Sequence, residues 1–409
     1  MTDPTATIVR EAGARAASAA AGFAASEPTT VRRALDALAA ALRDRADDLV
    51  AANDADVERA EGTLPEATVD RLRLGPDRLA GLADSIAVLA AADDAEVTVA
   101  THQLDDGTRV EERRRPVGVI GANFEARPNV TVDVASQLIK SRNTGVLRTG
   151  SAALESSSAL VDLAIAPALA AAGLDPDGIQ LLRTPERAAA HELVSHADLI
   201  PLVILRGSGE TTAQLAATAA AHGVRTLAHA EGGGVLFVHR GADLTDALDL
   251  IEKSLDRLGV CNRLNLLLLD EGIHDAFLPE VRSLCDRLSI TLSVEPHEHP
   301  LGHEWALDAG NEATLTVSRA GGPSEAAAIA NRETSGLAAG ISTTDAGAAE
   351  EFIAAYAGTG AFWNATTRLL DGFKLLAAPE TGINVDHVPG PRGPVTYRDL
   401  SLRQYVVRG

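Results

Sequence analysis

The sequence predicts an α/β protein with parallel, doubly wound sheets, and two observations lead to this fold class. Between residues 117 and 205, short apolar runs alternate with helical stretches, which is the pattern of parallel strands joined by crossover helices. A second block with the same alternation runs from residue 234 to residue 317. Because a chain of 409 residues usually holds two or three domains, we expect each block to form its own α/β domain.

The elements follow in order along the chain. Apolar residues three and four positions apart predict helices over residues 5–60, and Asp106-Gly107 between β-prone flanks predicts a β-hairpin over 97–115. The first block is expected to contain strands at 117–122, 144–148, 179–182 and 199–205, with helices near 130–140, 151–172 and 211–221. The second block is expected to contain strands at 234–238, 264–269 and 313–317, with helices near 244–257 and 273–286.

The tail beyond Pro379 is rich in proline and glycine and ends in a short strand-like segment at 404–408. Such a segment has too little apolar surface to fold alone, so we expect it to dock on another domain or on another subunit.

Charge and composition exclude several classes of function. The formal net charge is −21, and an acidic surface repels the phosphate backbone of nucleic acid. No apolar run of about 20 residues predicts a membrane span. The two cysteines lack both C-x-x-C spacing and the density of a disulfide framework, and the histidines lack a ligand constellation, so we expect a soluble, cytoplasmic protein without a metal site.

Cys261 is the candidate nucleophile. It follows Leu258-Gly259-Val260 and directly precedes an apolar strand, where a glycine lets the backbone or a ligand come close. The alternative is that Cys261 is a small buried hydrophobe, which is the interpretation we adopt for Cys285 inside a helical pattern.

Asn123 ends the strand at 117–122, at the edge where doubly wound sheets bind ligands. Its amide can donate a hydrogen bond to a developing oxyanion, although an asparagine there can also cap the next helix, and the same alternative holds for Asn129.

Two glycine-containing segments complete the candidates. Gly207-Ser208-Gly209 links a strand to a helix and can bring backbone N–H groups to a phosphate. Glu231, before three glycines, can serve as a general base, the alternative being a solvated loop charge.

Taken in order, these motifs resemble the aldehyde dehydrogenase superfamily and, within it, the gamma-glutamyl phosphate reductase family. The residues that carry the narrower resemblance lie in seven segments: Arg115–Gly121, Glu125–Asp133, Leu138–Ser141, Gly259–Asn262, Asn364–Arg368, Arg392–Pro394 and Tyr405–Gly409. The likeness spans nearly the whole chain, and its most specific parts are Glu125–Asp133 and the closing Tyr-Val-Val-Arg-Gly.

The resemblance implies a Rossmann-like cofactor domain over 1–233, an α/β catalytic domain over 234–378, and a tail over 379–409 that returns to the first domain. The 97–115 hairpin and the C-terminal strand would form a small β oligomerisation unit. The implied activity is NADPH-dependent reduction of gamma-glutamyl phosphate to glutamate-5-semialdehyde through a cysteine thioester, in proline biosynthesis. The implied partners are further copies of the chain and a glutamate 5-kinase.

The resemblance also assigns roles to residues. Cys261 would be the nucleophile, Asn123 and the Cys261 backbone N–H would hold the oxyanion, and Glu231 fits the general base of aldehyde dehydrogenases. Cofactor contacts are assigned to Arg148, Ser151, Gly207, Ser208 and Glu312, and substrate contacts to Arg127, Asn129 and Asn262.

The cofactor is expected to be NADP rather than NAD. General aldehyde dehydrogenases have Lys-Pro-x-Glu in this segment, and the glutamate binds the adenine ribose hydroxyls and repels a 2′-phosphate. Here Ser151 stands at the glutamate position and Arg148 keeps the cation. The alternative is that Arg148 packs along its strand and Ser151 only caps a helix.

Two other functions stay open. Glu231, where the reductases usually have aspartate, and Gly336–Ile341 resemble general aldehyde dehydrogenases, which favours an NAD(P)-dependent dehydrogenase acting on another aldehyde or acyl phosphate. A non-catalytic paralogue is the second alternative, against which the intact Cys261 and Asn123 argue.

Overall fold

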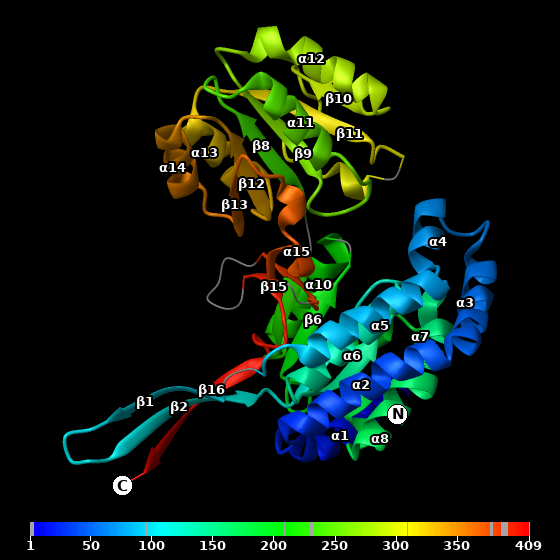
Figure 1. Ribbon diagram of the computed structural model, residues 1–409. Coiled ribbons are helices and arrows are strands. Elements are labelled where there is room, and N and C mark those ends of the chain that lie inside the picture. Colours follow the sequence, from blue (N-terminus) through cyan, green and yellow to red (C-terminus); the bar gives the residue numbers. More distant parts are fainter. Residues whose placement is uncertain are drawn as a thin grey trace. The chain divides into compact units, whose positions relative to one another are not determined.

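The computed structural model describes residues 4–94, 97–207, 209–229, 232–308, 310–376, 379–385 and 392–408. It divides into two compact units (Figure 1). Unit 1 comprises Met1–Ala230, Ala377–Asn384 and Pro394–Gly409, and unit 2 comprises Glu231–Leu376 and Val385–Gly393.

Unit 1 begins with five successive helices, α1 Pro4–Ala24, α2 Pro28–Asp44, α3 Ala46–Ala60, α4 Glu66–Leu72 and α5 Pro76–Ala91. Proline stands in the first turn of α2 and of α5, where its missing N–H costs no hydrogen bond. Helix α2 buries Val31, Leu35, Leu38 and Leu42 on one face, because these residues recur three and four positions apart. That face packs against α5 and α8, beside which α2 lies in Figure 1.

The core of unit 1 is a five-stranded parallel sheet in the order β5-β4-β3-β6-β7. Its strands are β3 Val119–Asn123, β4 Thr144–Arg148, β5 Ile179–Leu181, β6 Leu202–Arg206 and β7 Arg225–His229, and the connecting helices include α6 Pro128–Lys140, α9 Ala188–Leu193 and α10 Gly209–Ala221. Because the strand order reverses at β3, the carboxyl ends of β3, β4 and β6 form the switch point at which doubly wound sheets bind ligands.

The helical stretch Ser151–Ala172 contains an irregularity. It consists of the 3₁₀ turn η1 Ser151–Ala153, α7 Leu154–Leu160, the π-helical turn η2 Val161–Ile165 and α8 Ala166–Ala172. By length and composition alone this stretch is long and apolar enough to cross a membrane. The sequence analysis predicted no membrane span here, because Glu155 and Asp162 interrupt the run of apolar residues. Half of its most apolar 18-residue window is buried, and residues such as Leu160, Ala164 and Leu169 belong to the core of unit 1.

A separate three-stranded antiparallel sheet belongs to unit 1. Its strands are β1 Thr98–Gln103, β2 Arg109–Pro116 and β16 Ser401–Arg408, with β2 in the middle. The C-terminal strand pairs along the whole length of β2, from Ser401 opposite Pro116 to Arg408 opposite Arg109. Exposed apolar side chains on this sheet and just before it are Val97, Val99, Leu402, Tyr405 and Val407.

The rest of the tail docks on α6 of unit 1. The side chain of Gln137 donates to the carbonyl of Pro379 (2.9 Å) and accepts from the backbone N–H of Tyr397 (2.6 Å). The Tyr397 ring is buried, and its hydroxyl donates to the carbonyl of Asp93 (2.6 Å). Two short strands, β14 Gly382–Asn384 and β15 Gly393–Val395, pair with each other.

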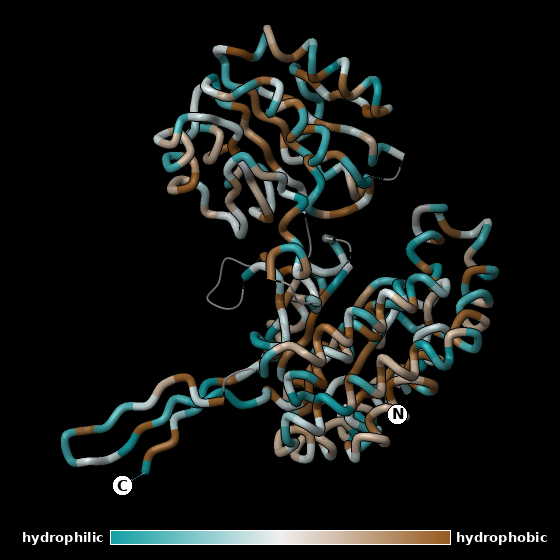
Figure 2. Tube along the Cα trace, viewed as in Figure 1, coloured by the Kyte–Doolittle hydropathy of each residue, from teal (hydrophilic) through white to brown (hydrophobic). Residues whose placement is uncertain are grey.

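Unit 2 is a six-stranded parallel sheet in the order β10-β11-β9-β8-β12-β13. Its strands are β8 Gly234–Val238, β9 Leu264–Asp270, β10 Thr291–Val294, β11 Thr314–Ala320, β12 Ala338–Ser342 and β13 Gly360–Trp363. Its helices are α11 Leu244–Ser254, α12 His274–Arg287, α13 Pro323–Glu333, α14 Ala346–Ala355 and the short α15 Gly372–Leu376, with the 3₁₀ turns η4 Trp305–Leu307 and η5 Thr367–Leu369. Helices α11 and α12 cover one face and α13 and α14 the other, so every residue of β8 and β9 is buried. Figure 2 shows the hydrophobic colouring of this part of the chain.

The predicted α/β fold class is confirmed, and the predicted strands of both blocks form within a few residues of their expected limits. Strands β7, β10, β12 and β13 were not predicted. β12 is the sequence Ala-Ala-Gly-Ile-Ser, in which only Ile341 has a strong strand preference, and it forms because it hydrogen-bonds to β8 on one side and β13 on the other.

Candidate active site

The Cys261 loop of unit 2 is held by backbone hydrogen bonds. The Cys261 carbonyl accepts from the Gly233 N–H (2.7 Å), and the Arg263 carbonyl accepts from the Gly234 N–H (2.8 Å). Gly259 has a φ of +69° and Gly233 a φ of +95°, values that favour glycine. The thiol-bearing residue is partly exposed at the start of β9, as a nucleophile requires.

Gly232 packs directly on this loop. A Cβ atom at position 232 would lie 2.6 Å from the Cα of Cys261 and 2.5 Å from its carbonyl oxygen, so only glycine fits there. The Gly232 N–H donates to Oε2 of Glu304 (2.8 Å), which fixes the glycine segment against Cys261. Glu304 therefore helps to position the loop, a role that the sequence did not predict.

Asn262 has a side chain directed into the protein. Its Nδ2 donates to the carbonyl of Leu370 (3.0 Å), and its Oδ1 accepts from the guanidinium of Arg368. Its backbone carbonyl accepts from the Thr367 hydroxyl (2.9 Å). These contacts bind the Cys261 loop to η5 and leave the buried Asn262 amide little capacity to bind a substrate.

Asn123 and Arg148 lie side by side at the carboxyl ends of β3 and β4 in unit 1. They are register partners, and Nη1 of Arg148 donates to Oδ1 of Asn123 (3.4 Å). Asn123 is buried, and its Nδ2 makes no hydrogen bond to any residue that the structure describes. The cap residue of α6 is Arg127, so the helix-capping alternative for Asn123 does not hold, nor does it hold for Asn129.

Two buried polar atoms next to Asn123 lack hydrogen-bond partners among the described residues: Nε of Arg148 and Oγ1 of Thr149. Burial and the neighbouring Arg187 both lower the pKa of Arg148, which still remains a cation at neutral pH. Buried polar atoms without hydrogen bonds at this edge of the sheet point to a ligand, because each missing hydrogen bond costs on the order of 1–3 kcal/mol.

Arg127 and Asn129 lie at the start of α6, close to the same edge. The guanidinium of Arg127 pairs with Glu125 (3.5 Å), and Nδ2 of Asn129 donates to Oδ2 of Asp133 one turn later (3.1 Å). Burial raises the pKa of Asp133 to about 6, although Arg206 and the hydrogen bond from Asn129 act to lower it. Asp133 and Arg206 were not predicted as site residues, although Asp133 is in the segment that carries the family resemblance.

Asp133→Asn is expected to stabilise the protein at neutral pH. The raised pKa means that the protonated carboxyl stabilises the fold below about pH 4, and this contribution is lost as the pH rises through about 6. The variant should exceed the wild type by about 1–3 kcal/mol near pH 8, with the difference shrinking as the pH approaches 4. Urea unfolding at both pH values checks this, with the exposed Asp54→Asn as a control of equal charge change. A variant less stable than the wild type near pH 8 would contradict the prediction.

The other residues predicted to bind the cofactor or to act as general base lie in different parts of the chain. Gly207 follows β6 and precedes α10, as predicted for a phosphate-binding turn. Ser151 is exposed and does not cap η1, whose cap residue is Gly150. In unit 2, the Glu312 carboxylate accepts from the Gly310 N–H (2.9 Å). Glu231 and Ser208 lie outside the described residues.

Comparisons with known proteins agree with the motifs. The sequence model of the aldehyde dehydrogenase family matches residues 1–300. Gamma-glutamyl phosphate reductase of Caulobacter sp. (strain K31) is 34% identical, covering 97% of this chain and 96% of that protein. The Neisseria meningitidis serogroup C protein of the same name is 32% identical and is covered to 92% in both directions.

Solved structures support the same assignment. The crystal structure of gamma-glutamyl phosphate reductase from Thermotoga maritima matches with a TM-score of 0.90 and 26% identity over 98% of each chain. An acetylating aldehyde dehydrogenase from Geobacillus thermoglucosidasius shares the fold, with a TM-score of 0.74 and 17% identity over 100% of this chain and 98% of that one. The resemblance seen in the motifs is confirmed, and the chain belongs to the gamma-glutamyl phosphate reductase family within the aldehyde dehydrogenases.

Proposed function

We propose that this protein is an oxidoreductase that reduces gamma-glutamyl phosphate to glutamate-5-semialdehyde and phosphate in proline biosynthesis. The observation that carries the proposal is the 34% identity to a gamma-glutamyl phosphate reductase over 97% of this chain. A partly exposed cysteine held at the start of β9 supports it, because this chemistry needs a nucleophile that a substrate can reach.

The reaction begins at Cys261. Its thiolate attacks the acyl carbon of gamma-glutamyl phosphate, a carbon–sulfur bond forms, and the carbon–oxygen bond to the phosphate breaks, which leaves a thioester and free phosphate. Arg148, Ser151 and Gly207 would hold a reduced nicotinamide cofactor, which would supply the hydride needed to reduce the thioester to the aldehyde level. Cleavage of the carbon–sulfur bond then releases the aldehyde and restores the thiolate of Cys261.

Asn123 is assigned to the oxyanion that forms when the thiolate attacks. Its Nδ2 has no partner among the described residues and is held in place because Oδ1 accepts from Arg148. A preorganised donor of this kind needs no reorganisation when charge develops, and we assign the Cys261 backbone N–H as the second donor.

For substrate binding, we assign Arg127 and Asn129 to the carboxylate and amino groups of the glutamyl moiety. Both belong to the family segment Glu125–Asp133 and lie at the start of α6. Asn262 is assigned a positioning role instead of the predicted substrate contact, because its amide already binds the Arg368 guanidinium and the Leu370 carbonyl.

The aldehyde dehydrogenase family uses nicotinamide cofactors. Unit 1 fits such a group, since the orphan atoms of Arg148 and Thr149 and the turn at Gly207 lie at the carboxyl ends of β4 and β6. We assign cofactor binding to Arg148, Ser151 and Gly207. NADP is favoured because two guanidinium groups, Arg148 and Arg187, interact here and their repulsion is relieved by an added phosphate.

Ser151→Glu is expected to move cofactor preference from NADPH towards NADH by about tenfold or more. The new carboxylate would repel the 2′-phosphate while binding ribose hydroxyls. Michaelis constants for both cofactors measure the change. Ala170→Glu, exposed on α8, adds the same charge elsewhere in unit 1 and should leave the preference unchanged. A wild-type enzyme that already prefers NADH would refute the argument.

The activity itself is tested by oxidation of glutamate-5-semialdehyde, the reverse reaction, with and without phosphate. Phosphate dependence is expected, because the thioester must be cleaved by phosphate to form gamma-glutamyl phosphate. Phosphate-independent oxidation, also seen with a simple aldehyde, would indicate an aldehyde dehydrogenase in which Glu231 activates water. No turnover with any substrate would indicate a non-catalytic paralogue.

We also propose a homo-oligomer assembled through the β1-β2-β16 sheet, which exposes Leu402, Tyr405 and Val407. A glutamate 5-kinase in the same cytoplasm would supply the acyl phosphate.

A further inference from the structure

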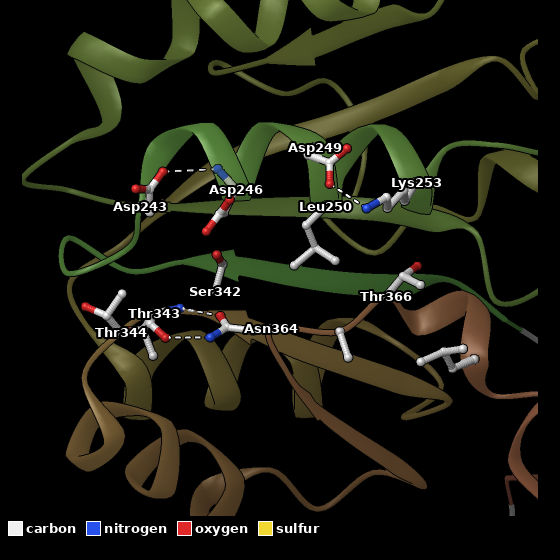
Figure 3. Close-up of a pocket in the computed structure, with 12 residues that line it drawn as sticks. Asp243, Asp246, Asp249, Leu250, Lys253, Ser342, Thr343, Thr344, Asn364 and Thr366 are labelled. Atoms are coloured by element: carbon white, nitrogen blue, oxygen red, sulfur yellow. Dashed lines mark hydrogen bonds and ion pairs between the residues drawn. The ribbon is translucent and has the colours of Figure 1, made fainter.

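Unit 2 contains a cavity of about 430 Å³ between α11 and the carboxyl ends of β12 and β13 (Figure 3). Three carboxylates line it, those of Asp246 and Asp249 on α11 and of Asp243, the residue that caps this helix, together with the ammonium group of Lys253. Ser342, the last residue of β12, lines it from the opposite side. The lining therefore carries a net negative charge.

The three carboxylates are not equivalent. Oδ1 of Asp243 caps α11 by accepting from the backbone N–H groups of Thr245 and Asp246, and Asp249 forms an ion pair with Lys253 (2.5 Å). The carboxylate of Asp246 accepts no hydrogen bond from any residue with a described position, and Figure 3 shows it turned into the space below α11. Asp246 is thus the acceptor that remains available to a ligand.

Ser342 provides a second, independent observation. The residue is 4% exposed and its hydroxyl makes no hydrogen bond to another described residue, while Figure 3 shows this hydroxyl directed into the same space. A hydroxyl that faces the cavity without a protein partner can form a hydrogen bond to a ligand bound there. The hydroxyl of the neighbouring Thr343 already has hydrogen-bond partners, which are Nδ1 of His239 and the backbone N–H of Asp345.

We propose that this cavity binds a small aliphatic amine, whose ammonium group donates to the carboxylate of Asp246 and to the hydroxyl of Ser342. Leu250, Ala365 and Leu369 offer apolar contacts to its methylene groups. The volume lies within the range of small-molecule sites. A metal ion fits the cavity less well, because the described residues contain no group of three or more His, Cys, Asp or Glu side chains arranged to hold one.

The probe is 1,4-diaminobutane, titrated calorimetrically into the full-length protein at about 0.15 M salt, which screens non-specific attraction to an acidic chain. Saturable binding of one molecule per chain is expected. Tetramethylammonium, which carries the same charge per nitrogen without N–H donors, should not bind. Absence of saturable binding of the diamine, or equal binding of tetramethylammonium, would overturn the proposal.

Variants assign the binding to this cavity. Asp246→Asn and Ser342→Ala should each lower the affinity for the diamine by about tenfold or more, as expected when a hydrogen bond to a charged group is lost. Glu252→Gln is the matched control, since Glu252 is exposed on the same helix, does not line the cavity and carries the same charge as Asp246. If Glu252→Gln weakened binding as much as Asp246→Asn, the affinity would depend on the net charge of the protein alone. The proposal that the diamine binds in this cavity would then be refuted.

Discussion

Cys261→Ala is expected to reduce turnover by at least ~10³-fold, the largest effect among the substitutions proposed for this protein. The loss follows because alanine cannot form the thioester through which the acyl group passes. Folding should be unaffected, because the loop is held by its backbone: the Cys261 carbonyl keeps its bond from Gly233, and Gly232 packs on Cα. Steady-state rates and thermal unfolding of the same preparations measure both quantities.

Cys285→Ala is the matched control for this prediction. Cys285 is fully buried on α12, and burial raises the pKa of its thiol to about 11, so it is a neutral thiol at physiological pH and no nucleophile. Its removal should leave turnover near the wild-type value. If Cys261→Ala kept a tenth of the activity, covalent catalysis through this residue would be wrong.

Asn123→Ala is expected to lower kcat by about 10²–10³-fold, the second largest effect, by removing a donor to the oxyanion. Little stability should be lost, because the only hydrogen bond described for the Asn123 side chain is the long one from Arg148 (3.4 Å). Single-turnover rates and melting temperatures separate the two roles. A marked fall in melting temperature with near-normal turnover would show that Asn123 is structural.

Asn331→Ala is a suitable control for this substitution. Asn331 is an exposed residue of α13 whose side chain holds the backbone of Ala355 and Ala357. Its replacement should cost some stability and leave kcat unchanged, the reverse of the result expected for Asn123.

Much of the fold could be predicted from short stretches of sequence. Strands β4 and β8 match their predicted limits, because each is an apolar segment with β-branched residues and its burial is visible in composition alone. Strand β12 could not be predicted in this way, because Ala338–Ser342 becomes a strand only through hydrogen bonds to two neighbours.

Some residues of the candidate site could likewise be predicted from the sequence, and others could not. Cys261 and Asn123 are recognisable because each stands at a strand end, and the family segments identify Arg127 and Asn129. Glu304 and Asp133 were missed because an acidic residue in a loop or a helix gives no sign of which backbone or side chain it will meet.

The sequence by itself determined the α/β class, the order of the motifs and the family, because these depend on residue types at short spacing. Only the tertiary structure decided what each side chain contacts. Asn262 stands beside the nucleophile in sequence, yet its amide binds Arg368, 106 residues away. Gly232 meets Cys261 so closely that no side chain fits between them. Such contacts join distant segments, and the physical reason they escape sequence patterns is that periodicity records which face is buried and not which partner covers it.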